Sequence, residues 1–155
     1  MDKNIKLSEH MTLGELIKTS VKTPDGNNPS RVAIENLRHI CENWLEELRY
    51  SYNTLYEKAP EELPLVITSG YRSEAVNKAV GGAATSNHLE GCAVDIRVDN
   101  FEQLIRFASI LLDISDGTKQ NFDELYIERN KAGRYWIHFA VRPKDNRRKM
   151  GMMIV

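Results

Sequence analysis

Three side chains of the kinds that bind divalent metals lie beside two apolar runs of the sequence. His88 and Asp95 flank a glycine-containing turn that leads into the first run, and His138 interrupts the second. A catalytic zinc needs three ligands of the His, Asp, Glu or Cys type and one position left open for water. These residues therefore fit a zinc centre. From spacing alone, the alternative is a structural histidine that is hydrogen-bonded within its strand.

Side-chain alternation predicts which residues of the first run, 92–98, face the ion. Asp95 shares its face with Ala93 and Gly91, whose small size leaves room for a metal. Cys92 points to the opposite face, into the expected core. We therefore do not expect Cys92 to be a ligand, although it lies close to two candidates in the sequence.

The same alternation divides the second run, 134–141, into a polar and an apolar face. His138 shares the polar face with Arg134 and Trp136. The apolar face consists of Tyr135, Ile137, Phe139 and Val141. The candidate ligand thus lies on the face that is free for function.

A longer pattern surrounds these candidates and resembles that of a known family. The pattern S-x-H-x-x-G-x-A-x-D is met by Ser86, His88, Gly91, Ala93 and Asp95, with SGYRS at 69–73 and VGG at 80–82 before it and WIH at 136–138 after it. The chain resembles the zinc D-Ala-D-Ala carboxypeptidase group, the M15 peptidases, and in particular its phage-endolysin-like branch. The resemblance covers most of the chain.

The resemblance implies roles for four residues. His88, Asp95 and His138 match the zinc ligands, and Arg72 matches an arginine that binds the substrate carbonyl and stabilises the oxyanion. A fixed guanidinium aimed at developing negative charge contributes several kcal/mol to catalysis. The alternative for Arg72 is a salt bridge at the start of a helix, but the adjacent Ser69–Gly70 turn favours the functional role.

The general base is not at the position where many members of the wider group carry a glutamate, three residues before the last ligand. That position is Tyr135, and alternation turns it away from the metal. The preceding run, 122–128, places Glu124, Tyr126 and Glu128 on one face. We predict that Glu128 is the base, with Glu124 as the second candidate. For either residue the alternative is an exposed strand carboxylate.

The register of the hairpin formed by the last two runs supports Glu128. Suppose that residues 131–133 form a three-residue loop with its glycine in the left-handed conformation. Tyr126 then lies opposite His138. Glu128 lies opposite Trp136 and diagonal to His138, and a diagonal cross-strand neighbour can reach a metal-bound water.

Tyr71, Ser86 and Trp136 complete the candidate site as substrate-binding residues. We expect Tyr71 and Trp136 to line a groove, the alternative being ordinary packing. Ser86 is also expected to support His88, because a ligating histidine usually donates its free ring N–H to a nearby acceptor. Asn87 could do the same.

The elements that must position these residues alternate between helix and strand. Thr12 and Glu15 form a capping box before a short helix, and Ser30 caps a long one with apolar residues at three- and four-residue spacing. The other expected elements are strands at 65–69, 92–98, 122–128 and 134–141 and helices at 72–80 and 101–112. This order predicts an α+β fold with a mainly antiparallel central sheet flanked by helices, similar to hedgehog and DD-peptidase folds.

The length of 155 residues suits one domain. We therefore expect a single zinc peptidase domain over residues 1–155, with an N-terminal helical part, about residues 1–58, packed on the catalytic sheet. A net charge of −1 gives no basic field for nucleic acid or an anionic membrane. We expect a monomer with no nucleic-acid or membrane partner.

The N-terminus lacks the apolar segment and cleavage site of a secretory signal. We expect synthesis in the cytoplasm, free cysteines at Cys41 and Cys92, and action on the cell wall after release or non-standard export. The resemblance implies a zinc peptidase that hydrolyses peptidoglycan stem peptides, as a D-Ala-D-Ala carboxypeptidase or a cell-wall endopeptidase. The alternative is an inactive, zinc-containing module that binds cell-wall peptides.

Overall fold

The computed structural model describes residues 1–56 and 63–155 and is built around a five-stranded sheet. The strand order is β3-β4-β6-β5-β7, and the first three pairs are antiparallel whereas β7 runs parallel to β5. The strands are β3 (Ile67–Ser69), β4 (Ala93–Arg97), β5 (Glu124–Arg129), β6 (Tyr135–Ala140) and β7 (Lys149–Ile154). The prediction of an α+β fold with a mainly antiparallel sheet is confirmed.

Helices surround this sheet, and a small hairpin precedes them. The hairpin pairs β1 (Lys6–Ser8) with β2 (Met11–Thr12). The helices are α1 (Leu13–Leu16), α2 (Arg31–Ile40), the π-helical η1 (Cys41–Leu45), α3 (Glu46–Leu55), α4 (Glu74–Ala79), the 3-10 helix η2 (Asn87–Glu90) and α5 (Phe101–Thr118). Within the described ranges, none of them combines the length and apolarity needed to cross a membrane.

Side-chain caps begin the helices where the sequence predicts them. The Thr12 hydroxyl accepts from the Glu15 backbone N–H, and the Glu15 carboxylate accepts from the Thr12 backbone N–H, which confirms the capping box. The Ser30 hydroxyl accepts from the Ala33 N–H at 3.1 Å. From there α2, η1 and α3 continue as one helical stretch. The expected end of the helical part, near residue 58, lies outside the described residues.

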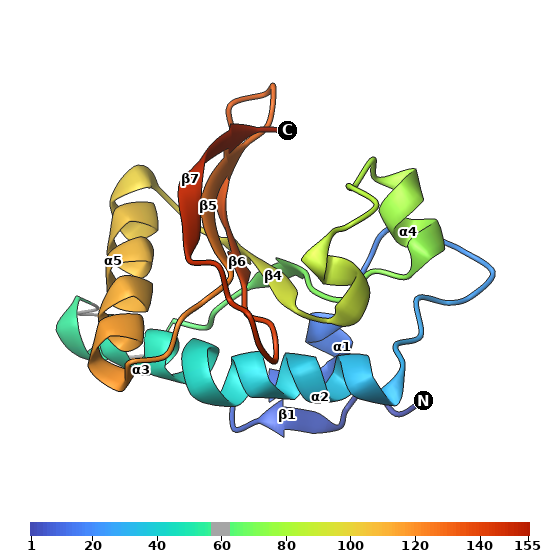
Figure 1. Cartoon of the computed structure of the whole chain (residues 1–155), viewed down its shortest axis with the longest axis horizontal. Helices are drawn as coiled ribbons and strands as arrows, with labels where there is room; N and C mark the ends of the chain where they lie inside the picture. Colours follow the sequence, from blue (N-terminus) through green and yellow to red (C-terminus); the bar gives the residue numbers. More distant parts are fainter. Residues whose placement is uncertain (57–62) are drawn as a thin grey trace.

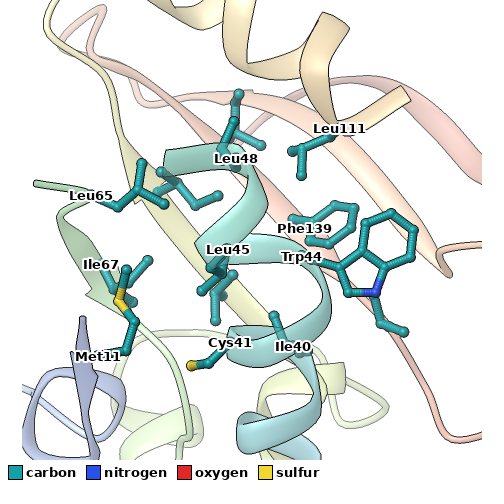
Figure 2. Close-up of a cluster of buried hydrophobic side chains, with 14 of the residues drawn as sticks. Met11, Ile40, Cys41, Trp44, Leu45, Leu48, Leu65, Ile67, Leu111 and Phe139 are labelled. Carbon is teal, nitrogen blue, oxygen red and sulfur yellow. The ribbon is translucent and has the colours of Figure 1, made fainter. Parts of the chain in front are cut away.

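The hydrophobic core joins this helical stretch to one face of the sheet. Figure 2 shows Trp44 beside Phe139, and their ring centroids are 5.1 Å apart. Leu45 and Leu48 of the same helical stretch are fully buried in this cluster, and so is Leu111 of α5. Burying each such side chain contributes about 1.5–3 kcal/mol to stability.

Among the described residues, the core cluster packs against one face of the sheet. In Figure 1, α5 stands on one side of the strands and α4 on the other. Ile137 and Phe139 of β6 belong to the core, as the predicted alternation requires. His138 and Asp95 therefore face the opposite side, toward η2 and α4.

The register of the β5–β6 hairpin matches its prediction. Tyr126 pairs with His138, and Glu128 pairs with Trp136. Gly133 adopts a φ of +86°, as expected for the left-handed position of the loop.

The C-terminal strand β7 is absent from the sequence-based prediction. Met150, Met152 and Ile154 are 52%, 64% and 70% exposed, so the strand shows no alternation of buried and exposed residues. The strand pairs in parallel with β5, a segment that is distant in the sequence, so no local turn signals the pairing. Helix α5 also extends beyond the expected end at residue 112 and reaches Thr118.

A substitution at Gly91 tests the close packing of the end of η2 against α2. The φ of Gly91 is +70°, and a Cβ there would lie 2.5 Å from the Ala33 carbonyl oxygen in α2. We expect Gly91→Ala to cost about 1–2 kcal/mol of backbone strain and roughly 1–3 kcal/mol more for the steric contact. Gly133→Ala is the matched control, because its φ is also positive but nothing lies within 4 Å. Urea unfolding measures both, and equal losses would contradict the steric contribution.

Candidate metal centre

His88, Asp95 and His138 meet on the polar face of the sheet. Each offers a ligand atom, and these atoms all lie within 4.8 Å of one another. Asp95 Oδ1 is 3.3 Å from His88 Nε2 and 3.1 Å from His138 Nδ1. All three residues are buried. Three nitrogen and oxygen donors thus converge on one point.

Local structure explains why these distant residues meet. Asp95 and His138 are direct cross-strand partners in the β4–β6 ladder. His88 comes from η2, and the left-handed Gly91 ends that turn and leads the chain into β4. Ala93, the neighbour of Asp95 on the same face, is fully buried and too small to fill the centre.

The outward-facing atom of each candidate ligand has its own partner. His88 Nδ1 lies 2.6 Å from the Gly70 carbonyl oxygen, and His138 Nε2 lies 3.0 Å from Glu124 Oε1. Asp95 Oδ2 accepts from Arg72 Nη2 at 3.3 Å. These contacts leave His88 Nε2, Asp95 Oδ1 and His138 Nδ1 directed at the common point. Partners of this kind fix the orientation and tautomer of metal-binding histidines.

The charges of the centre favour a cation. Burial acts to raise the pKa of Asp95, but His88 and His138 outweigh it, so the pKa falls well below its usual range. Burial acts to lower the pKa of His138, but hydrogen bonds to Asp95 and Glu124 outweigh it and raise the pKa to about 10. The carboxylates thus attract positive charge to this point, as a proton or as a metal ion.

The donor set fits zinc. Two imidazoles and one carboxylate are a common ligand set for catalytic zinc. Cys92 is not one of the converging donors, and its buried thiol instead lies 3.8 Å from the Glu90 carbonyl oxygen. Burial raises the pKa of Cys92 to about 11, which disfavours the thiolate that binds metals.

The two carboxylates of β5 occupy different environments. Glu124 is bonded to His138 and also accepts from Asn87 Nδ2 at 2.8 Å. Burial acts to raise the pKa of Glu124, but these two hydrogen bonds outweigh it and the pKa is lowered. Glu128 instead accepts from Trp136 Nε1 at 2.8 Å, and burial raises its pKa.

Arg72 is fixed beside the centre. Its Nε donates to the Ser69 hydroxyl at 3.0 Å, and its Nη2 binds Asp95. Within the part of the chain that the structure describes, Nη1 has no hydrogen bond. The guanidinium is thus anchored on two sides with one nitrogen still available.

The other predicted site residues lie nearby in different roles. Ser86 accepts the backbone N–H of His88 at 3.2 Å, whereas the ring of His88 is bonded to Gly70 rather than to Ser86 or Asn87. Tyr71 packs against the hydrophobic core. Trp136 is bonded to Glu128, as described above.

Sequence reasoning missed three contacts at the centre. The Gly70 carbonyl and the pairing of Glu124 with His138 were not predicted, and neither was the ring of Tyr126, which stacks on His138 at 5.7 Å between centroids. For Tyr126 the sequence does contain a signal, because the predicted hairpin register places it opposite His138. A backbone carbonyl leaves no such signal in the sequence.

Comparison with protein families places most of the chain within a known family model. A family model described as Peptidase M15 matches residues 9–121. The matched range includes His88 and Asp95 and ends before His138. No curated protein matches the chain.

We expect zinc to stabilise the chain through this centre. Zinc at about 100 times its Kd should add about 2.7 kcal/mol to the free energy of unfolding, because it binds only the folded chain. His138→Ala should abolish this gain, whereas Cys92→Ala should keep it. Thermal unfolding with zinc and with a chelator measures the difference. Loss of the zinc-induced stabilisation in Cys92→Ala would contradict the candidate ligand set.

Proposed function

The chain belongs to the M15 peptidase family, and on this premise we propose that it is a zinc metallopeptidase that hydrolyses peptidoglycan stem peptides. We also propose that it works as one domain over residues 1–155. The observation that carries the proposal is the convergence of His88, Asp95 and His138 at one buried point, with every outward-facing atom already bonded.

Zinc is the proposed metal, and His88 Nε2, Asp95 Oδ1 and His138 Nδ1 are its proposed ligand atoms. When bound, zinc would supply Lewis-acid polarisation of the scissile carbonyl and lower the pKa of water to about 7. The residues around the centre would supply charge stabilisation and proton transfer.

Arg72 is the proposed oxyanion-stabilising residue. Its contacts with Ser69 and Asp95 hold the guanidinium before substrate arrives, so little reorganisation is needed during reaction. Its Nη1 would donate to the carbonyl oxygen as negative charge develops there.

Glu128 is the proposed general base. Its raised pKa suits a group that accepts a proton from the attacking water and later donates it to the leaving amine. One carboxylate oxygen is held by Trp136, and the other has no hydrogen bond to the residues described here. Glu124 is less suitable as the base, because its Oε1 already accepts hydrogen bonds from His138 and Asn87.

The substrate would lie on the polar face of the sheet. We propose that Tyr71, Ser86 and Trp136 contact the peptide there and that the chain acts as a monomer. The bond cut is either the terminal D-Ala-D-Ala bond or an internal bond of the stem peptide or cross-bridge.

One observation supports a second function, an inactive module that binds cell-wall peptides. Tyr135 occupies the position where many members of the wider group carry a catalytic glutamate. This module would hold zinc and bind wall fragments without cutting them. Mass spectrometry of purified peptidoglycan after incubation, with and without a chelator, separates the two functions and identifies the bond.

We expect Glu128→Gln to lower the rate of peptide hydrolysis about 10²- to 10⁴-fold, because the amide cannot accept the proton. Zinc content should stay at the wild-type value. Glu102→Gln, at an exposed glutamate on α5, is the matched control and should keep full activity. A fully active Glu128→Gln chain would refute the assignment of the base.

We expect Arg72→Ala to lower kcat/KM about 10²- to 10³-fold, comparable to the loss of one oxyanion donor. Zinc content must be measured in parallel, because Arg72 also contacts Asp95. Loss of activity together with loss of zinc would assign Arg72 to the support of the metal centre instead.

A further inference from the structure

We propose that Asn87, Asp123 and Arg147 form a clamp that positions Glu124 and so determines how tightly the centre holds its metal. This inference rests on the proposed zinc centre and concerns residues that touch no ligand atom directly. It assigns Glu124 as a positioning residue that acts through His138.

Asn87 is the first part of the clamp. Its Nδ2 lies 2.8 Å from Glu124 Oε1 and 2.8 Å from Asp123 Oδ2. An amide nitrogen has two hydrogens, so these two carboxylates use both. The Asn87 Oδ1 accepts from Arg142 Nε at 3.3 Å, which fixes the direction of the amide.

Asp123 and Arg147 form the second part. Asp123 is fully buried and accepts from Arg147 Nε at 3.0 Å and Nη2 at 2.8 Å, a two-pronged pair. Arg147 Nη2 is also 3.6 Å from Glu124 Oε2. Arg142 Nε lies 3.1 Å from Asp123 Oδ2. Two guanidinium groups thus compensate two adjacent carboxylates at the start of β5.

The clamp leaves Glu124 little freedom to rotate. Its Oε1 accepts from Asn87 and His138, and its Oε2 faces Arg147. A carboxylate held in this way accepts a hydrogen bond from His138 Nε2 and so fixes the orientation of the ring. The Nδ1 atom is then directed at the metal centre. Without the clamp, Glu124 could turn toward solvent and His138 could change its tautomer or rotamer.

The clamp joins three segments that are far apart in the sequence. Asn87 lies in η2 beside the ligand His88, whereas Asp123 and Arg147 lie beyond residue 121, where the family match ends. The connection between β6 and β7 therefore contributes to the metal centre although it supplies no ligand.

A double-mutant cycle on zinc affinity tests the clamp. Asn87→Ala and Glu124→Ala should each weaken zinc binding about 10- to 100-fold, the usual effect of removing a group that orients a ligand. The double variant should bind no more weakly than Glu124→Ala, because Asn87 acts through Glu124. Competition with a chromophoric chelator measures the Kd values, and circular dichroism of the metal-free chains checks that each is folded.

Matched variants give the controls. Arg147→Ala should weaken zinc binding like Asn87→Ala. Arg148→Ala removes a neighbouring arginine that is bonded to Ser115 and Asp116 and not to Glu124. It should lower stability and leave the Kd for zinc unchanged. Glu124→Gln should recover part of the affinity lost in Glu124→Ala, because its amide oxygen can still accept from His138.

Each outcome decides the inference. Wild-type affinity in Asn87→Ala, additive losses in the double variant, or an equal loss in Arg148→Ala would each overturn the clamp. A wild-type chain that binds no zinc would overturn both the clamp and the proposed function. Zinc binding without hydrolysis of peptidoglycan would overturn the peptidase assignment alone, and the cycle would still decide the clamp.

Discussion

The buried carboxylate of Asp95 is the group on which the rest of the site depends. A buried charge is tolerated only when it is paired and hydrogen-bonded, and Asp95 has such partners on both oxygens. His88 and His138 share one oxygen, and Arg72 binds the other. These partners come from η2, β6 and the segment after β3. Folding around this one carboxylate therefore brings the candidate ligands and the candidate oxyanion donor together.

Local rules predict much of this arrangement. Alternation in β4 and β6 separates Asp95 and His138 from the core, and a loop closed by Gly133 sets the register that puts Glu128 opposite Trp136. Helix caps and apolar spacing likewise locate the long N-terminal helical stretch. Each of these features depends on a few neighbouring residues, so it can be read from the sequence without knowledge of the tertiary fold.

The remaining features depend on contacts between distant segments. The register makes Glu124 and Glu128 equally diagonal to His138, and tertiary packing helps to distinguish them because it brings Asn87 and Arg147 to Glu124. The acceptor for His88 is a backbone carbonyl, which any residue type could supply. Strand β7 pairs in parallel with β5 and has no buried side, so neither alternation nor a turn signal marks it.

The connection between β6 and β7, which carries Arg147, is synthesised after every other part of the candidate site. A nascent chain emerging from the ribosome would expose His88 and Asp95 well before His138, and the arginine that secures Glu124 would come last. An unfinished chain would thus present two donors without the third or its support. The complete set of candidate donor groups would therefore exist only once the polypeptide has been made beyond β6.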